Sequence, residues 1–176
     1  VAKGAEDTVI GRIEEARKKL LVIERNRQRI MEKLHASEKS LRASEIRFRS
    51  YFELPLVGIA ITSLEKKWLE VNSRLCELLG YSKDELTKLT WAEITYPDDL
   101  VFNFAEFENA LASKAEGYSL DKRLLRKDGL IIYASILVCC VCNQDGSPNY
   151  FLVLVQDITA RKKVEDELRE YRSLSS

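Results

Sequence analysis

An unbroken heptad pattern occupies the first third of this chain of 176 residues. Between residues 9 and 52 there is no proline and one glycine, and apolar side chains recur in alternating steps of three and four. The pattern lasts for about six heptad repeats, whereas about three or four are usually enough to predict a coiled coil. We therefore expect residues 1–52 to form a helix of a parallel, dimeric coiled coil. The predicted dimer seam consists of Ile13, Leu20, Ile23, Arg27, Ile30, Leu34, Leu41 and Phe48.

Charged residues beside the seam favour the parallel arrangement. Lys19 and Glu24, for example, have opposite charges at positions that face each other between parallel strands in register. Arg27 lies in the seam itself, where a polar side chain lowers stability but fixes register and oligomeric state. His35, the only histidine, is expected on the solvent-facing side, and no phosphoacceptor motif follows it. The alternative is a single amphipathic helix that lies on its own globular domain.

The composition excludes several functional classes. Lys and Arg number 28 and Asp and Glu number 28, whereas nucleic-acid and anionic-membrane surfaces need a basic excess. We therefore expect no nucleic-acid partner and no direct membrane contact. Three of the four cysteines lie in one apolar run, where cysteine packs as a small hydrophobe, which favours reduced thiols in the cytoplasm. Because the chain has no initial methionine and is helical in pattern almost at once, we expect a segment of a longer protein.

The order of helix and strand signals in residues 53–159 predicts an α+β domain. Pro55 ends the long helix, Asn72 is a natural N-cap, Gly80 a natural helix stop and Ser82 the start of a capping box. Asp128 and Gly129 predict a tight hairpin between two strands. This order gives a five-stranded antiparallel sheet with short helices on one face. We expect strands at 57–62, 67–71, 118–126, 130–143 and 149–157, and helices at 73–79, 97–114 and 159–171.

An ordered set of short motifs runs through residues 45–165. They are Glu45-Ile46-Arg47-Phe48, Phe52-Glu53, Val71-Asn72, Glu77-Leu78-Leu79-Gly80-Tyr81-Ser82, Pro97-Asp98-Asp99, Arg126-Lys127-Asp128-Gly129, Asp157-Ile158-Thr159 and Arg161-Lys162. This ordered set resembles a PAS domain of the bacterial sensor type. The first hairpin departs from the family's usual Asp-x-x-Gly turn and has Ser63-Leu64-Glu65-Lys66-Lys67 instead.

The resemblance implies a sensory and dimerisation module of a histidine kinase, diguanylate cyclase or chemoreceptor. It would form a homodimer through the N-terminal helix and relay a signal to a downstream output domain through a linker helix at residues 160–176. Asp157 and Thr159 would couple the sheet to that helix. Glu85 would pair with Lys127, as in similar domains, and this pair is a second candidate for signal coupling. A ligand-free structural dimerisation or spacer domain is the alternative function.

No catalytic or metal site is predicted. One histidine cannot complete a nucleophilic triad, the seven glycines are isolated, and the cysteine spacing lacks the separated pairs of a zinc site. Haem and flavin are not expected, because the histidine and the reactive cysteine with which similar domains hold them are missing. An unknown small organic ligand is expected at most, since aromatic side chains between the helices and the sheet suit one. Alternatively, these aromatics simply fill the core. The candidate pocket residues are Trp91, Tyr96, Phe102, Phe104, Phe107, Tyr133, Ser135 and Leu137.

Overall fold

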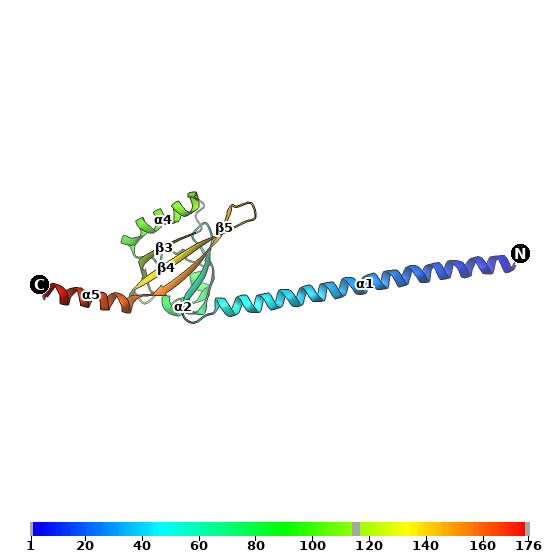
Figure 1. The fold of residues 1–176 in the computed structure, drawn as a ribbon, viewed down its shortest axis with the longest axis horizontal. Helices are drawn as coiled ribbons and strands as arrows, with labels where there is room; N and C mark the ends of the chain where they lie inside the picture. The colour runs from blue at the N-terminus through cyan, green and yellow to red at the C-terminus, as the bar shows by residue number, and fades with distance from the viewer. Residues whose placement is uncertain (1, 114–116, 175–176) are drawn as a thin grey trace. The chain divides into compact units, whose positions relative to one another are not determined.

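The computed structural model describes residues 2–113 and 117–174, and it divides the chain into two compact units, residues 1–49 and 50–176. The helix α1 (Ala2–Phe52) makes up the first unit and ends inside the second (Figure 1). All other elements belong to the second unit. Each unit is described by itself.

Helix α1 is continuous over 51 residues, which confirms the long N-terminal helix. The side chains of the predicted seam are exposed in the single chain, from 48% at Phe48 to 71% at Leu41. The ion pair between Lys19 and Glu15 (2.8 Å) lies within one helix. Association of two such helices would cover the apolar row, and this dimer remains a prediction.

The second unit contains one five-stranded antiparallel sheet, as the sequence predicts. Its strands lie in the order β2-β1-β5-β4-β3, and β3, β4 and β5 form a meander of consecutive hairpins (Figure 1). Observed boundaries differ from the predicted ones by one residue at most. The strands are β1 (Gly58–Thr62), β2 (Trp68–Val71), β3 (Gly117–Leu125), β4 (Ile131–Cys142) and β5 (Pro148–Asp157).

Short helices cover one face of the sheet and share a single core with it. Their buried side chains, such as Leu75, Leu86 and Phe107, pack with the inward residues of every strand. The predicted helix at 97–114 begins as a turn of 3-10 helix at Pro97, and its residue 114 lies outside the described residues. The helices are α2 (Ser73–Leu79), α3 (Lys83–Leu86), η1 (Pro97–Asp99), α4 (Leu100–Ser113) and α5 (Thr159–Leu174).

The predicted helix boundaries of α2 and α3 are confirmed in detail. The Asn72 side chain accepts from the Leu75 amide, and Gly80 ends α2 in the left-handed conformation at φ +78°. Ser82 and Glu85 form a reciprocal capping box at the start of α3. In the first hairpin, Lys66 adopts φ +71°, a conformation that favours glycine. The first hairpin therefore keeps a glycine-like backbone conformation at Lys66 although its turn contains no glycine.

Candidate functional site

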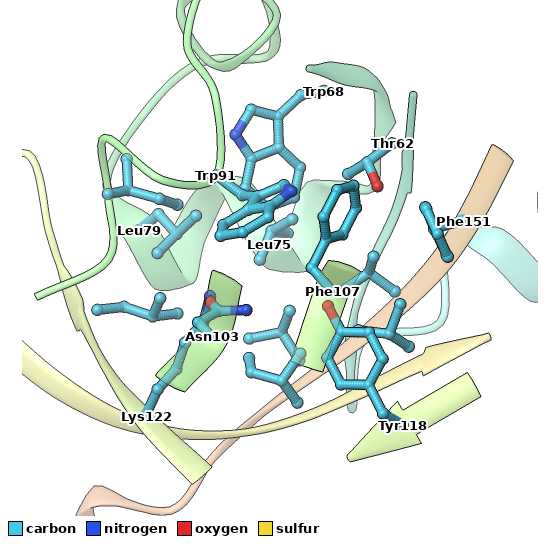
Figure 2. Close-up of a pocket in the computed structure, with 16 residues that line it drawn as sticks. Thr62, Trp68, Leu75, Leu79, Trp91, Asn103, Phe107, Tyr118, Lys122 and Phe151 are labelled. Atoms are coloured by element: carbon cyan, nitrogen blue, oxygen red, sulfur yellow. The ribbon is translucent and has the colours of Figure 1, made fainter. Parts of the chain in front are cut away.

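A small cavity lies in the core between the inner face of the sheet and the helices (Figure 2). Its volume is about 30 Å³, enough for one or two water molecules and far below the usual size of a site for a drug-sized ligand. Most lining side chains are apolar, contributed by α2, α4 and the strands. The polar side chains in the lining come from Thr62, Trp68, Trp91, Asn103, Tyr118 and Lys122.

Lys122 brings an amino group into this core. It lies on β3 between the inward-facing Leu120 and Leu124, and only 8% of its surface is exposed. Its Nζ donates to Thr95 Oγ1 at 2.9 Å and to Asn103 Oδ1 at 2.5 Å. The same nitrogen lies 5.0 Å from the centre of the Trp91 ring, at a distance typical of a cation–π contact. In Figure 2 the Lys122 side chain extends towards Asn103, with the Trp91 ring above them.

Burial is the largest influence on the pKa of Lys122. Desolvation lowers its pKa to about 7, and the negative charge of Asp99 opposes this shift. Asp99 itself is held by Arg123, whose Nη2 lies 2.6 Å from Asp99 Oδ1. No ion pair of Lys122 occurs within the described residues, so neutral oxygens and a ring face surround its amino group.

Two further polar groups border the cavity. Burial, with a contribution from the charge of Glu106, raises the pKa of Tyr118 to about 12, and a hydrogen bond with Asn103 opposes the shift. Trp68 is 5% exposed, and its buried Nε1 has no hydrogen-bond acceptor among the described residues. A buried indole N–H normally finds one, so the lining holds an unsatisfied donor.

Aromatic side chains pack on one side of the cavity. The Trp91 ring lies 5.5 Å from that of Phe107 and 5.4 Å from that of Phe104. Trp91 and Phe107 line the cavity, whereas Phe104 packs behind them, half-buried. Tyr96 is also half-buried, and its ring lies 4.1 Å from the Arg123 guanidinium carbon instead of in the lining. Of these four predicted pocket aromatics, Trp91, Phe104 and Phe107 pack together, and only Trp91 and Phe107 border the space.

The prediction for β4 named the wrong face of the strand. Tyr133 and Leu137 are 39% and 43% exposed, and the half-buried Ser135 lies on the same outer face. Ile132, Ala134, Ile136 and Val138 are the inward residues, because they alternate with the predicted ones and are buried.

Phe102 is likewise outside the lining. It is 59% exposed on α4, because the inward side of this helix carries Asn103, Phe107 and Ala110 at helical spacing.

Sequence reasoning missed Lys122, Asn103 and Trp68. A signal for Lys122 exists in the alternation of β3, where it takes the place between Leu120 and Leu124 that an apolar residue would hold. Asn103 is four residues before Phe107 and therefore on the same side of α4. The missing acceptor of Trp68 Nε1 has no signal in the sequence, because it depends on every side chain around the ring.

The predicted coupling residues at the start of α5 form a compact junction. The Thr159 amide donates to Asp157 Oδ1 at 2.8 Å, and Thr159 Oγ1 accepts from the Tyr133 amide of β4 at 3.1 Å. Asp157 thus caps the helix, while Thr159 fastens its first residue to the neighbouring strand. The Arg161 side chain of α5 also lies 3.6 Å from Asp121 of β3.

Glu85 and Lys127 form the predicted pair, with 2.6 Å between Glu85 Oε1 and Lys127 Nζ. The carboxylate also accepts from the Ser82 amide at 3.0 Å. These contacts lower the pKa of Glu85, the bond from Lys127 contributing most. Both side chains are exposed, which limits the contribution of such a pair to stability.

A second junction, at the end of α1, rests on Asn72, whose side chain is fully buried. Its Oδ1 accepts from the amides of Ile59 and Leu75, both at 2.9 Å. Its Nδ2 donates to the carbonyls of Phe52 at 2.8 Å and Val57 at 3.0 Å. The sequence predicted only the bond to Leu75. The other three join the last turn of α1 to β1.

Glu53 adds a charged contact to this junction. Its carboxylate accepts from the Ser73 amide at 2.9 Å and from Lys83 Nζ at 3.0 Å. The bond from the Ser73 backbone is the main cause that lowers the pKa of Glu53 to about 2.

The sheet order β2-β1-β5-β4-β3 and the helices on one face define an antiparallel α+β fold with a helix before it and a helix after it. The PAS fold family matches residues 69–155, and the globular part of this chain is therefore a PAS domain.

Two curated relatives are multidomain signalling proteins. The chain is 34% identical to a probable diguanylate cyclase of Escherichia coli and 27% identical to the sensor histidine kinase TmoS of Ectopseudomonas mendocina. These alignments cover 77% and 78% of this chain but only 12% and 14% of the relatives. The similarity thus concerns one part of each relative.

Solved structures confirm the fold. A PAS domain from Colwellia psychrerythraea, 22% identical, has a TM-score of 0.59 and covers 65% of this chain and 98% of that one. An RNA-binding light-oxygen-voltage receptor, 16% identical, has a TM-score of 0.64 and covers 74% of this chain and 37% of that one. At these identities the likeness concerns the fold alone. No helix in the described part of the chain is long and apolar enough to cross a bilayer.

Proposed function

We propose that this chain is a sensory and dimerisation module that passes the state of its PAS core through helices to an output domain. Two of its chains would associate in parallel along α1, and α5 would lead towards a cyclase or kinase domain of the kind named in the relatives. The observation that carries the proposal is that both helices are fastened to the same sheet, α1 through Asn72 and α5 through Asp157 and Thr159.

The exposed apolar row on α1 supports the dimer. Helices gain most of their stability in proteins from packing of an apolar face, and a coiled coil would bury the row. Of the predicted seam residues, Leu20, Ile23 and Ile30 are 61–65% exposed in one chain. A bundle of two helices also offers the discrete arrangements that a relay requires, because its packing can switch between registers or rotations.

Sedimentation equilibrium of the whole chain tests the dimer. We expect a dimer at tens of micromolar, and a monomer at this concentration would contradict the proposal. Ile23→Lys should shift the chain towards monomer, because it puts a charge at a core position of the seam. Val22→Lys is the matched control, since Val22 is the adjacent residue, 57% exposed and outside the predicted seam. Equal effects of both substitutions would refute the predicted register.

A ligand-free dimerisation or spacer domain is the second candidate function. The cavity of about 30 Å³ favours it, because a core so nearly filled has no room for a larger organic ligand without rearrangement. Native mass spectrometry of the purified chain separates the two functions. A bound small molecule supports sensing, and a mass equal to that of the polypeptide alone supports the spacer.

A further inference from the structure

We propose that the core cavity binds a small planar oxyanion, of the size of formate or nitrate, with Lys122 as its counter-charge. This inference rests on the proposed sensory function, because it treats the cavity as the site where the state of the core is set. It adds the chemical class of the ligand and the residue that selects it.

The buried amino group of Lys122 favours an anionic ligand. An ammonium group in a protein core is costly unless an anion pairs with it. Lys122 Nζ has neutral acceptors, Thr95 Oγ1 and Asn103 Oδ1, and the nearby carboxylate of Asp99 is already bound by two Arg123 nitrogens, at 3.1 and 2.6 Å. The core therefore holds an amine that is a cation below its pKa of about 7, and it leaves the counter-charge of that cation to a ligand.

The hydrogen-bond donors around the cavity also favour a ligand that only accepts. The Lys122 ammonium has three N–H groups, and two protein oxygens accept from them. Trp68 Nε1, on the wall of the same cavity, donates to no acceptor among the described residues. An oxyanion carries only acceptors, so it suits a space with donors in excess, whereas a ligand rich in N–H groups does not.

The volume of the cavity limits the size of the ligand. A cavity of about 30 Å³ holds one or two waters, so a ligand has to be very small, with roughly four non-hydrogen atoms at most. The side chains around the cavity, among them Leu75, Phe107 and Val153, are packed, so its volume does not admit a longer carbon chain in this arrangement. Larger carboxylates should therefore be rejected.

Binding should depend on pH in a defined direction. The anion pairs with protonated Lys122, so affinity should fall about tenfold per pH unit above the pKa of about 7 of the empty site. The charged and titratable groups around Lys122 are few. Asp99 on η1 stays ionised because Arg123 lowers its pKa, and Tyr118 on β3, with a pKa of about 12, stays neutral. Glu106 on α4 acts on Tyr118, while α4 and residues 91–95 present Asn103, Trp91 and Thr95 to the amino group.

The test is thermal unfolding of the whole chain with sodium formate as the probe, sodium nitrate as a second oxyanion and sodium gluconate at equal concentration as the oversized control. We expect the midpoint temperature to rise saturably with formate and nitrate but not with gluconate, because a ligand of the folded state stabilises it. The rise should weaken between pH 7 and pH 9. Isothermal titration calorimetry in two buffers of different ionisation enthalpy should show proton uptake on binding.

Lys122→Met is the decisive variant, because it keeps the length and apolar stem of the side chain and so preserves the fold. It should abolish the effect of formate, whereas Lys88→Met, which removes an exposed lysine outside the cavity, should leave it unchanged. Equal effects of formate and gluconate, or an undiminished effect in Lys122→Met, would overturn the inference. Oligomeric state is measured on the same samples. A dimer without formate binding refutes this inference alone, and a monomer that binds formate refutes only the relay.

Discussion

Replacing Asn72 by alanine should strongly destabilise the PAS core. The side chain is fully buried, and it makes four hydrogen bonds with backbone groups of Phe52, Val57, Ile59 and Leu75. A methyl group replaces none of them. Four amide or carbonyl groups would lose their partner, and those that stay buried bear the full cost of desolvation.

The magnitude follows from these bonds. The bonds to Phe52 and Leu75 are buried, and an unsatisfied buried group costs about 1–3 kcal/mol. The other two are partly buried, and water would compensate part of their loss. We therefore expect Asn72→Ala to lower the free energy of unfolding by about 3–4 kcal/mol. In a domain of this size that is a decrease of roughly 10–15 °C in Tm.

Equilibrium unfolding in urea, followed by tryptophan fluorescence, measures the loss. Both tryptophans, Trp68 and Trp91, are buried in the PAS core, so the signal reports this unit and not α1. Asn143→Ala is the matched control. It removes one exposed bond, from Nδ2 to Ser147 Oγ, and should change stability by less than about 0.5 kcal/mol. A loss for Asn72→Ala as small as that of the control would refute the reasoning that this side chain holds the junction together.

Three further predictions concern charge and backbone space. The pKa of Glu53 is about 2, below the ordinary value of 4.5, so its stabilising contribution should be present above pH 4.5 and disappear as the pH falls towards 2. In urea unfolding from pH 6 to pH 2, the free energy of unfolding should therefore fall less steeply in Glu53→Gln than in the unchanged chain. The pKa of Lys122 lies below its ordinary 10.5, so the unfolded chain binds more protons than the folded one between pH 7 and pH 10.5. The stability of the unchanged chain should therefore rise over this range relative to that of Lys122→Met. Parallel curves of stability against pH for the two proteins would contradict the buried state of the amine. Gly117→Ala should destabilise the pairing of β3 and β4, because a Cβ there would overlap the Val138 carbonyl oxygen. Gly146→Ala is the control: its Cβ meets no atom within 4 Å, and its only cost is the φ of +81°. A circular-dichroism melt should give a lower Tm for Gly117→Ala than for Gly146→Ala.

The sequence predicted the elements well because their signals are local. The cap of Asn72, the stop at Gly80 and the capping box of Ser82 are short-range patterns, and each lies where it was expected. The face of β4 was not predictable in this way. Both of its faces carry large apolar side chains, such as Ile136 and Leu137, and alternation separates two faces without saying which one the helices cover.

The chemistry of the cavity depends on residues that are distant in sequence. Lys122 meets Thr95 and Asn103, which are 27 and 19 positions away, and no local pattern brings these three together. Three of the four bonds of Asn72 are equally long-range, reaching back 13 to 20 positions. Propensity and periodicity locate helices and strands, but a polar cluster in the core is defined only once those elements are packed.

The two helical junctions differ from the surface pair as candidates for signal coupling. Glu85 and Lys127 are both exposed, and an exposed ion pair contributes too little free energy to separate two states of a domain. Asn72, in contrast, links the end of α1 to Ile59 of β1, which is paired with Leu154 of β5, and β5 ends at the Asp157 that caps α5. If a change in the core moved β1 or β5, the hydrogen bonds at the two helix ends would either break or move the helices together with the strands. We therefore expect the coupling energy of the relay to reside mainly in Asn72 and in the Asp157–Thr159 junction.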